Sequence, residues 1–315
     1  MEELTEKLYS KLLTLSESIW EGRVKKPQID EWLGNFQETL PGVPSERLHV
    51  LYLLQQFMYF GNRQIRELIK AIYRDLYKYP IVEKLRKDNN DTSDTQFIFR
   101  AFCEELQKTR FLGMGNPSES GHYLLYFFRQ ENKLPKSLFI HSHQIFSRYG
   151  TPTVELRSPE VSRYVFIDDM CGSGTQAGEY SEQILQDLKK LNPKAETAYY
   201  TLFSTTLGLS EVRNNTDFDR VECIFELDDT FKCFSAESRY FQPGDKRIDP
   251  RFALDICQRY GGRLLPDHPL GYKDGQLLLG LHHNTPDNSL PIFWYDEPEI
   301  SPWVPVFRRY PKYYG

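Results

Sequence analysis

The stretch RYVFIDDMCGSGTQAGEYSEQIL spans residues 163–185 and joins a hydrophobic run, an acidic pair and a glycine-rich loop. Residues 164–167 are aromatic or β-branched and predict a strand. Asp168 and Asp169 follow this strand, and the loop after them leads into a helix that opens near Gln176. Strand, loop and helix in this order predict one βα step of a parallel sheet.

The same alternation continues on both sides of this stretch. Short runs rich in β-branched and aromatic residues predict further strands at 138–140, 197–203 and 221–227. Helical segments lie between the strands, at 121–132, 176–191 and 209–214. The alternation predicts right-handed crossovers and an α/β fold with a mainly parallel sheet. The last apolar stretch, residues 276–294, predicts two strands joined by a polar turn and therefore a C-terminal antiparallel add-on.

The first 110 residues have a different pattern. Their apolar residues recur at helical spacing, as at Leu48, Leu51 and Leu54. No residues there have the spacing of a catalytic site. The sequence therefore predicts a helical leader for packing or interaction at residues 1–110, followed by one α/β domain at residues 111–315.

Composition limits the classes of function. Of the 315 residues, 39 are Lys or Arg and 44 are Asp or Glu, which gives a net charge of −5 and excludes a wholly basic, polyanion-binding surface. Nucleic acid is therefore expected only through a companion subunit. The five cysteines fit neither a disulfide framework nor a zinc ribbon. With no long apolar run and no signal-like N-terminus, we expect a cytoplasmic protein that does not enter a membrane.

The loop after the acidic pair has the chemistry of a phosphate cradle. Glycines let backbone amides face one point, hydroxyls add donors, and a helix N-terminus adds unpaired N–H groups. The residues expected to hold a phosphate are Gly172, Ser173, Gly174, Thr175 and Gln176.

The acidic pair stands where a ribose or a metal would lie beside that phosphate. Asp168 and Asp169 are candidates to hold ribose hydroxyls, or Mg²⁺ through its waters. The loop is neither a Walker A loop nor a GxGxxG fingerprint, because its glycines are Gly172, Gly174 and Gly178. The alternative interpretation is a glycine-rich turn in which one acid caps the helix.

VFIDDMCGSGT, residues 165–175, resembles the motif that binds 5-phosphoribosyl-1-pyrophosphate (PRPP) in type I phosphoribosyltransferases. The resemblance implies that Asp168 and Asp169 hold the ribose 2′- and 3′-hydroxyls and that the following loop wraps the 5′-phosphate. It also implies Mg²⁺ as cofactor and transfer or hydrolysis at the anomeric carbon. Gln176 departs from the family pattern, in which most members have Thr at this place.

Two upstream segments match further parts of that family. LGMGNPSESGHYLLYFF, residues 112–128, has the position of the pyrophosphate loop, where Ser118, Ser120 and Gly121 would face pyrophosphate. The alternative is that Ser118 or Ser120 only caps a helix. Residues 142–162 have the place of the mobile catalytic loop, or form an ordinary solvated loop. The nearby cations that would neutralise pyrophosphate are Arg148, Arg157 and Arg163.

The whole layout is similar to phosphoribosyltransferase-like proteins of bacterial conflict and anti-phage loci, some of them beside retrons. The similarity rests on the helical leader, the GxxNPSxSG turn, the IDDxxGSGTQ loop and a tail that begins PLGYKDGQ at residue 269. It implies an antiviral defence effector that binds PRPP or another phosphorylated nucleotide. A non-catalytic phospho-ligand sensor, or a structural partner that assembles through the leader with another protein or another copy, stays open. His282, His283 and Asn284 either line the pocket or only form a polar turn.

Overall fold

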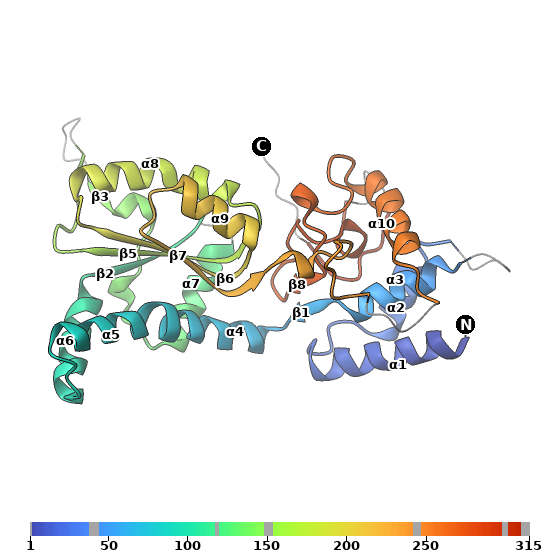
Figure 1. The fold of residues 1–315 in the computed structure, drawn as a ribbon, viewed down its shortest axis with the longest axis horizontal. Helices are drawn as coiled ribbons and strands as arrows, with labels where there is room; N and C mark the ends of the chain where they lie inside the picture. The colour runs from blue at the N-terminus through green and yellow to red at the C-terminus, as the bar shows by residue number, and fades with distance from the viewer. Residues whose placement is uncertain are drawn as a thin grey trace. The chain divides into compact units, whose positions relative to one another are not determined.

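The computed structural model describes residues 2–37, 44–116, 120–147, 154–241, 247–297 and 302–309 (Figure 1). The chain forms two compact units. We call residues 66–227 the sheet unit, and residues 1–65 together with 228–315 the terminal unit. None of the helices in the described ranges is long and apolar enough to cross a membrane.

Four parallel strands form the centre of the sheet unit and confirm the expected α/β class. In spatial order they are β2 (Thr109–Gly113), β5 (Arg163–Cys171), β6 (Glu196–Thr205) and β7 (Arg220–Leu227). The two central strands are almost fully buried, as strands covered by helices on both faces are expected to be. A two-residue antiparallel pair, β3 (Phe146–Ser147) and β4 (Glu155–Leu156), lies outside this sheet.

Helices cover both faces of the sheet (Figure 1). One face carries α8 (Thr175–Leu191) and α9 (Thr206–Asn215), whose apolar residues share a core with β5, β6 and β7. The other face carries α7 (Ser120–Glu131) and the π-helix η1 (Ile72–Lys78), where Tyr77 and Phe128 both pack against Phe111. The remaining helices of this unit are α4 (Asn62–Ala71, which begins in the terminal unit), α5 (Tyr79–Asp88), α6 (Thr95–Gln107), η2 (Lys136–Leu138) and η3 (Ser142–Gln144).

The order in which strands are added reverses at β2. Phe139 forms a parallel bridge with Phe111 of β2, whose other side is occupied by β5. The chain therefore adds a strand-like segment on one side of β2 and then crosses to β5 on the other side. Such a topological switch point is where open parallel sheets bind ligands, in the crevice at the carboxyl ends of the strands. The loops after β2 and β5 border this place.

The terminal unit combines the beginning and the end of the chain around one aromatic-rich core. Trp32 stacks on Phe293 with ring centroids 5.4 Å apart, and its Nε1 donates to Ile292 O at 2.8 Å. The elements of this unit are α1 (Glu2–Ser18), α2 (Lys26–Leu33), α3 (Glu46–Gln55), β1 (Met58–Phe60), η4 (Asp229–Phe231), α10 (Pro250–Leu264), η5 (Tyr272–Asp274), β8 (Leu279–Leu281) and η6 (Pro291–Phe293).

Three expectations differ from the structure. The helical N-terminal region is present, but the division falls at residue 65 and not at 110, because helices after residue 65 pack with the sheet. Residues 276–294 contain one short strand in the described chain, and this β8 pairs in parallel with β1 instead of forming an antiparallel add-on. The strand expected at 138–140 is a single bridge at Phe139.

Candidate functional site

The acidic pair lies inside β5 and not after it. The strand continues through Cys171, with Asp168 paired with Thr201 and Met170 paired with Phe203 of β6. The expected end at residue 167 was therefore too early by four residues. β6 supplies hydrogen-bond partners over its whole length, and these outweigh the low strand propensity of the two aspartates.

Each carboxyl group is held by a different element. Tyr199 of β6 donates its hydroxyl to Asp168 Oδ2 at 3.1 Å, and Asp169 N donates to Asp168 Oδ1 at 3.0 Å. Ser120, the first residue of α7, donates Oγ to Asp169 Oδ1 at 2.8 Å. The last bond joins the two segments that the sequence assigned to pyrophosphate and ribose.

Burial controls the protonation of this part of the site. Burial raises the pKa of Asp168 well above its usual range, and the negative charge of Asp169 acts in the same direction. Burial also raises the pKa of Cys171 to about 11, so this thiol stays protonated at neutral pH. Asp168 therefore keeps its proton to a higher pH than an exposed aspartate does.

The raised pKa predicts a pH-dependent stability. The folded state binds the Asp168 proton more tightly than the unfolded chain does, in which the pKa is about 3.9. This stabilising contribution is therefore complete below that value and is lost as pH rises through the folded-state pKa. We expect Asp168→Asn, which has no charge to bury, to raise the melting temperature relative to wild type, and to do so more at alkaline than at acidic pH.

Asp228→Asn is the control, because the contribution of Asp228 to stability has the opposite pH dependence. Asp228 is exposed, and its hydrogen bonds from Thr230 lower its pKa, so its contribution is present at neutral pH and is lost on acidification. Thermal denaturation across a range of pH values measures both variants. Equal pH profiles for wild type and Asp168→Asn would contradict a raised pKa of the buried Asp168.

The loop between β5 and α8 depends on glycine. Gly174 precedes α8 with a φ of +77°, a left-handed conformation that other residues rarely adopt. A Cβ there would also lie 2.9 Å from the side chain of Glu211. Ser173 donates Oγ to Thr175 Oγ1 at 3.1 Å, so two of the expected phosphate donors lie together at the beginning of the helix.

Residues of β6 and α9 hold the loop between β5 and α8 in place. Ser204 donates Oγ to Cys171 O at 3.1 Å, and the Thr205 hydroxyl donates to Gly172 O. A Cβ on Gly208 would lie 2.6 Å from Gly172 O and 2.7 Å from Cys171 O, so α9 packs directly on the loop. The sequence analysis missed these three residues. Their signal is a run of hydroxyl residues directly after a predicted strand, followed by a glycine.

Close backbone packing also holds the upstream turn. Met114 N donates to Ile167 O at 3.0 Å, so the chain after β2 stays against β5. A Cβ on Gly121 would lie 2.5 Å from Met114 O, so only glycine permits this approach of α7. Ser120 and Gly121 thus lie beside the acidic pair, whereas Ser118 is outside the described residues.

Other candidate residues lie elsewhere or are not placed. Arg163 begins β5, about 16 Å along the strand from Asp168, and is paired with Glu196 at 2.7 Å, so it is not a cation of the acidic site. Arg157 follows the short strand β4, and Arg148 lies outside the described residues. His282, His283 and Asn284 follow β8 in the terminal unit, and a role for them over the ligand stays a prediction.

Asp168 and Asp169 fit a magnesium ion that keeps most of its waters, but not one held in a cage of protein ligands. Among the described residues, no three His, Cys, Asp or Glu side chains converge into a metal cage. Mg²⁺ does not need one, because it keeps several waters and is usually bound through one or two carboxylates together with substrate phosphates. Asp168 and Asp169 match that mode of binding.

Several solved structures are similar to parts of this chain. Of the solved structures, the Helicobacter pylori xanthine-guanine-hypoxanthine phosphoribosyltransferase is 11% identical, with a TM-score of 0.27, over 54% of this chain and 90% of that one. The Aeropyrum pernix orotate phosphoribosyltransferase is 12% identical, with a TM-score of 0.22, over 40% of this chain and 73% of that one. The Trypanosoma brucei adenine phosphoribosyltransferase is 14% identical, with a TM-score of 0.24, over 53% of this chain and 80% of that one.

No curated protein matches the sequence. A family match, in contrast, covers residues 29–309, which is most of the 315-residue chain. It includes the acidic pair, the loop after β5, the turn before α7 and the C-terminal tail. The chain belongs to PRTase-CE, the phosphoribosyltransferase family of conflict systems.

Proposed function

We propose that this protein binds PRPP, or a nucleotide that offers the same ribose 5-phosphate, and acts at its anomeric carbon. The observation that carries the proposal is the 2.8 Å hydrogen bond from Ser120 Oγ to Asp169 Oδ1. It joins the beginning of α7 to the acidic pair at the switch point of the sheet, where a ligand is expected. Membership of a phosphoribosyltransferase family supports the same ligand.

The residues have separable roles in this proposal. The loop from Gly172 to Gln176 anchors the 5′-phosphate at the beginning of α8, where the helix dipole favours an anion. Asp169 and Asp168 orient the ribose hydroxyls. Ser120 and Gly121, with Ser118, place the pyrophosphate group at the beginning of α7.

The reaction proposed here exchanges one bond at the anomeric carbon. The bond from C1 to the pyrophosphate oxygen breaks and pyrophosphate leaves with the electron pair, while the acceptor or water forms a new bond to C1 and loses a proton. When bound, Mg²⁺ would neutralise charge on the leaving pyrophosphate. The protein contributes by fixing the ribose and both phosphate groups relative to one another.

A non-catalytic sensor is the second candidate, and the burial of Asp168 favours it. Its side chain is held by Tyr199 and its pKa is raised, so it offers less charge to a ribose than an exposed carboxylate would. In either form we propose a role in anti-phage defence, with a cytoplasmic location. The N-terminal helices within residues 1–65 would then contact a partner protein or a second copy.

Calorimetric titration of PRPP and Mg²⁺ into the wild-type chain, followed by an assay for pyrophosphate, separates these functions. We expect saturable binding and release of pyrophosphate. Binding without release would support the sensor. Absence of binding to PRPP and to ribose 5-phosphate nucleotides would contradict both.

A further inference from the structure

Tyr199 is a buried tyrosine of β6, with 1% of its surface exposed. The register of β5 and β6 places Tyr199 opposite Phe166 and Thr201 opposite Asp168, so the hydroxyl reaches along the sheet towards its carboxyl end. There it donates to Asp168 Oδ2 at 3.1 Å. Burial of a hydroxyl costs free energy unless it forms a hydrogen bond, and phenylalanine would fill the same space without that cost. Packing alone therefore does not explain a tyrosine at this position, whereas the bond to Asp168 does.

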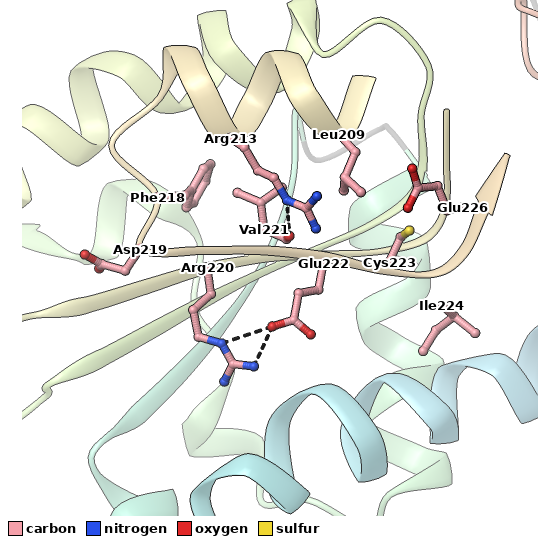
Figure 2. A pocket seen from close by; sticks show the side chains of 10 residues that line it. All are labelled: Leu209, Arg213, Phe218, Asp219, Arg220, Val221, Glu222, Cys223, Ile224 and Glu226. Carbon is pink, nitrogen blue, oxygen red and sulfur yellow. Dashed lines mark hydrogen bonds and ion pairs between the residues drawn. The ribbon is translucent and has the colours of Figure 1, made fainter. Parts of the chain in front are cut away.

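Neighbouring aromatic rings hold the ring of Tyr199. It stacks on Phe218 with ring centroids 5.6 Å apart, and Phe218 meets Phe166 edge to face at 5.3 Å. Figure 2 shows Phe218 on the same side of β7 as Leu209 of α9, where both residues line a hollow of about 620 Å³. Phe218 thus lies between this hollow and the ring of Tyr199, and it limits how far the ring can turn.

The chain around Phe218 is itself anchored. The next residue, Asp219, donates its backbone N–H to Thr197 O at 3.0 Å, and its carboxylate pairs with Lys189 of α8 at 2.5 Å. Phe218 is therefore tied through its neighbour to both β6 and α8. Groups whose conformations are locked by packing on strands and helices hold a binding site more precisely than groups on loops do.

Asp168 connects Tyr199 to the ligand side of the sheet. Asp168 Oδ1 accepts from Asp169 N at 3.0 Å, and Asp169 Oδ1 accepts from Ser120 Oγ at 2.8 Å. Three hydrogen bonds therefore run in series from β6 to α7. Loss of the first bond removes the donor that fixes Oδ2, so the carboxyl group of Asp168 can rotate and the next bond weakens with it.

We propose that Tyr199 is a positioning residue of the acidic site. Its hydroxyl fixes the carboxyl group of Asp168 and, through it, the orientation in which the acidic pair holds a ribose. The inference rests on the proposed function, which takes the ribose of PRPP as the group that the pair holds. Tyr199 itself contacts no ligand in this proposal. The loop of residues 172–176, which holds the phosphate, does not depend on its hydroxyl.

Calorimetric titration of the full-length protein with two ligands tests this role. We expect Tyr199→Phe to bind PRPP with Mg²⁺ about tenfold more weakly than wild type, the effect of one lost hydrogen bond. Inorganic phosphate needs the loop but not the acidic pair, so its affinity should not change. Tyr200→Phe is the matched control, because Tyr200 faces the other side of the sheet, where its ring lies 5.8 Å from the Arg220 guanidinium. It should bind both ligands as wild type does.

A double-mutant cycle shows whether Tyr199 acts through Asp168. The cycle is needed because the Tyr199 hydroxyl also interacts with the Cys171 thiol. In an Asp168→Ala background no carboxyl group remains for the hydroxyl to hold, so Tyr199→Phe should weaken PRPP binding by less than about twofold. A full tenfold loss in that background would overturn the proposal. An equal loss for PRPP and for phosphate in the single variant would also overturn it, because that would report general damage to the fold.

A second variant leaves the hydroxyl in place. Phe218→Leu removes the ring that stacks on Tyr199, and we expect PRPP binding to weaken while phosphate binding is retained. Wild-type affinity for PRPP in both Tyr199→Phe and Phe218→Leu would overturn the inference and leave the proposed function intact. A wild-type protein that does not bind PRPP would instead contradict the proposed function itself. Thermal denaturation of each variant checks that it is folded at the temperature of the titration.

Discussion

The double variant Asp168→Asn, Asp169→Asn is expected to fold and to release pyrophosphate from PRPP at least about 100- to 1000-fold more slowly than wild type. A loss of this size is typical when one preorganised polar contact of a reacting group is removed. Asparagine has nearly the same shape as aspartate, and its amide oxygen can still accept the hydrogen bond from Tyr199. The variant therefore loses the negative charge of the pair, while the packing of β5 is retained.

A second adjacent acidic pair supplies the control. Asp228 and Asp229 are exposed, and Asp228 accepts a hydrogen bond from Thr230 N at 3.0 Å at the beginning of a short helix. The double Asn variant of this pair should release pyrophosphate at the wild-type rate. Single-turnover assays measure the rate of pyrophosphate release by both variants, and circular dichroism checks that both are folded. A wild-type rate after removal of Asp168 and Asp169 would exclude these residues from the reaction.

Gly208→Ala is expected to weaken PRPP binding by about 10- to 100-fold, because a displacement near 1 Å of a positioning group has consequences of this order. The new Cβ would lie 2.6 Å from Gly172 O and 2.7 Å from Cys171 O, and neither backbone oxygen can move without the loop. Overpacking of this kind also costs about 1–3 kcal/mol of stability. Gly208 itself contributes no side chain to a ligand, so the loss of binding would report the position of the loop.

Gly178→Ala is the matched control in the neighbouring helix. A Cβ at Gly178 meets no atom within 4 Å. Alanine should therefore stabilise α8 by about 0.5–1 kcal/mol and leave PRPP binding unchanged. Calorimetric titration and thermal denaturation of both variants measure the two effects. Wild-type binding by Gly208→Ala would show that packing of α9 does not position the loop.

Local sequence predicted most of the elements of the sheet unit. The runs around 164–167, 197–203 and 221–227 became β5, β6 and β7, and the helices between them became α8 and α9. These segments combine strong strand propensity or helical periodicity with clear breaks at glycine and asparagine. Where propensity and packing agree, neighbouring residues alone are sufficient.

Local sequence patterns did not predict the pairings in which a strand or side chain meets a segment that is distant in the sequence. β8 pairs with β1, more than two hundred residues earlier in the chain, and no local pattern could indicate this. The hydroxyls of Ser204 and Thr205 reach the loop after β5 only because β6 lies beside β5 in register. Tyr199 meets Asp168 for the same reason.

The sequence by itself therefore determined the hydrophobic strand, the acidic pair and glycine loop that follow its apolar run, and the family to which they point. Their chemistry resides in consecutive residues, whose types and order can be read along the chain. Only the tertiary structure decided that Asp168 is buried against Tyr199, that Ser120 meets Asp169, and that the two ends of the chain share one core. Burial and long-range pairing depend on which segments meet in space, and these set the charge of the acidic pair.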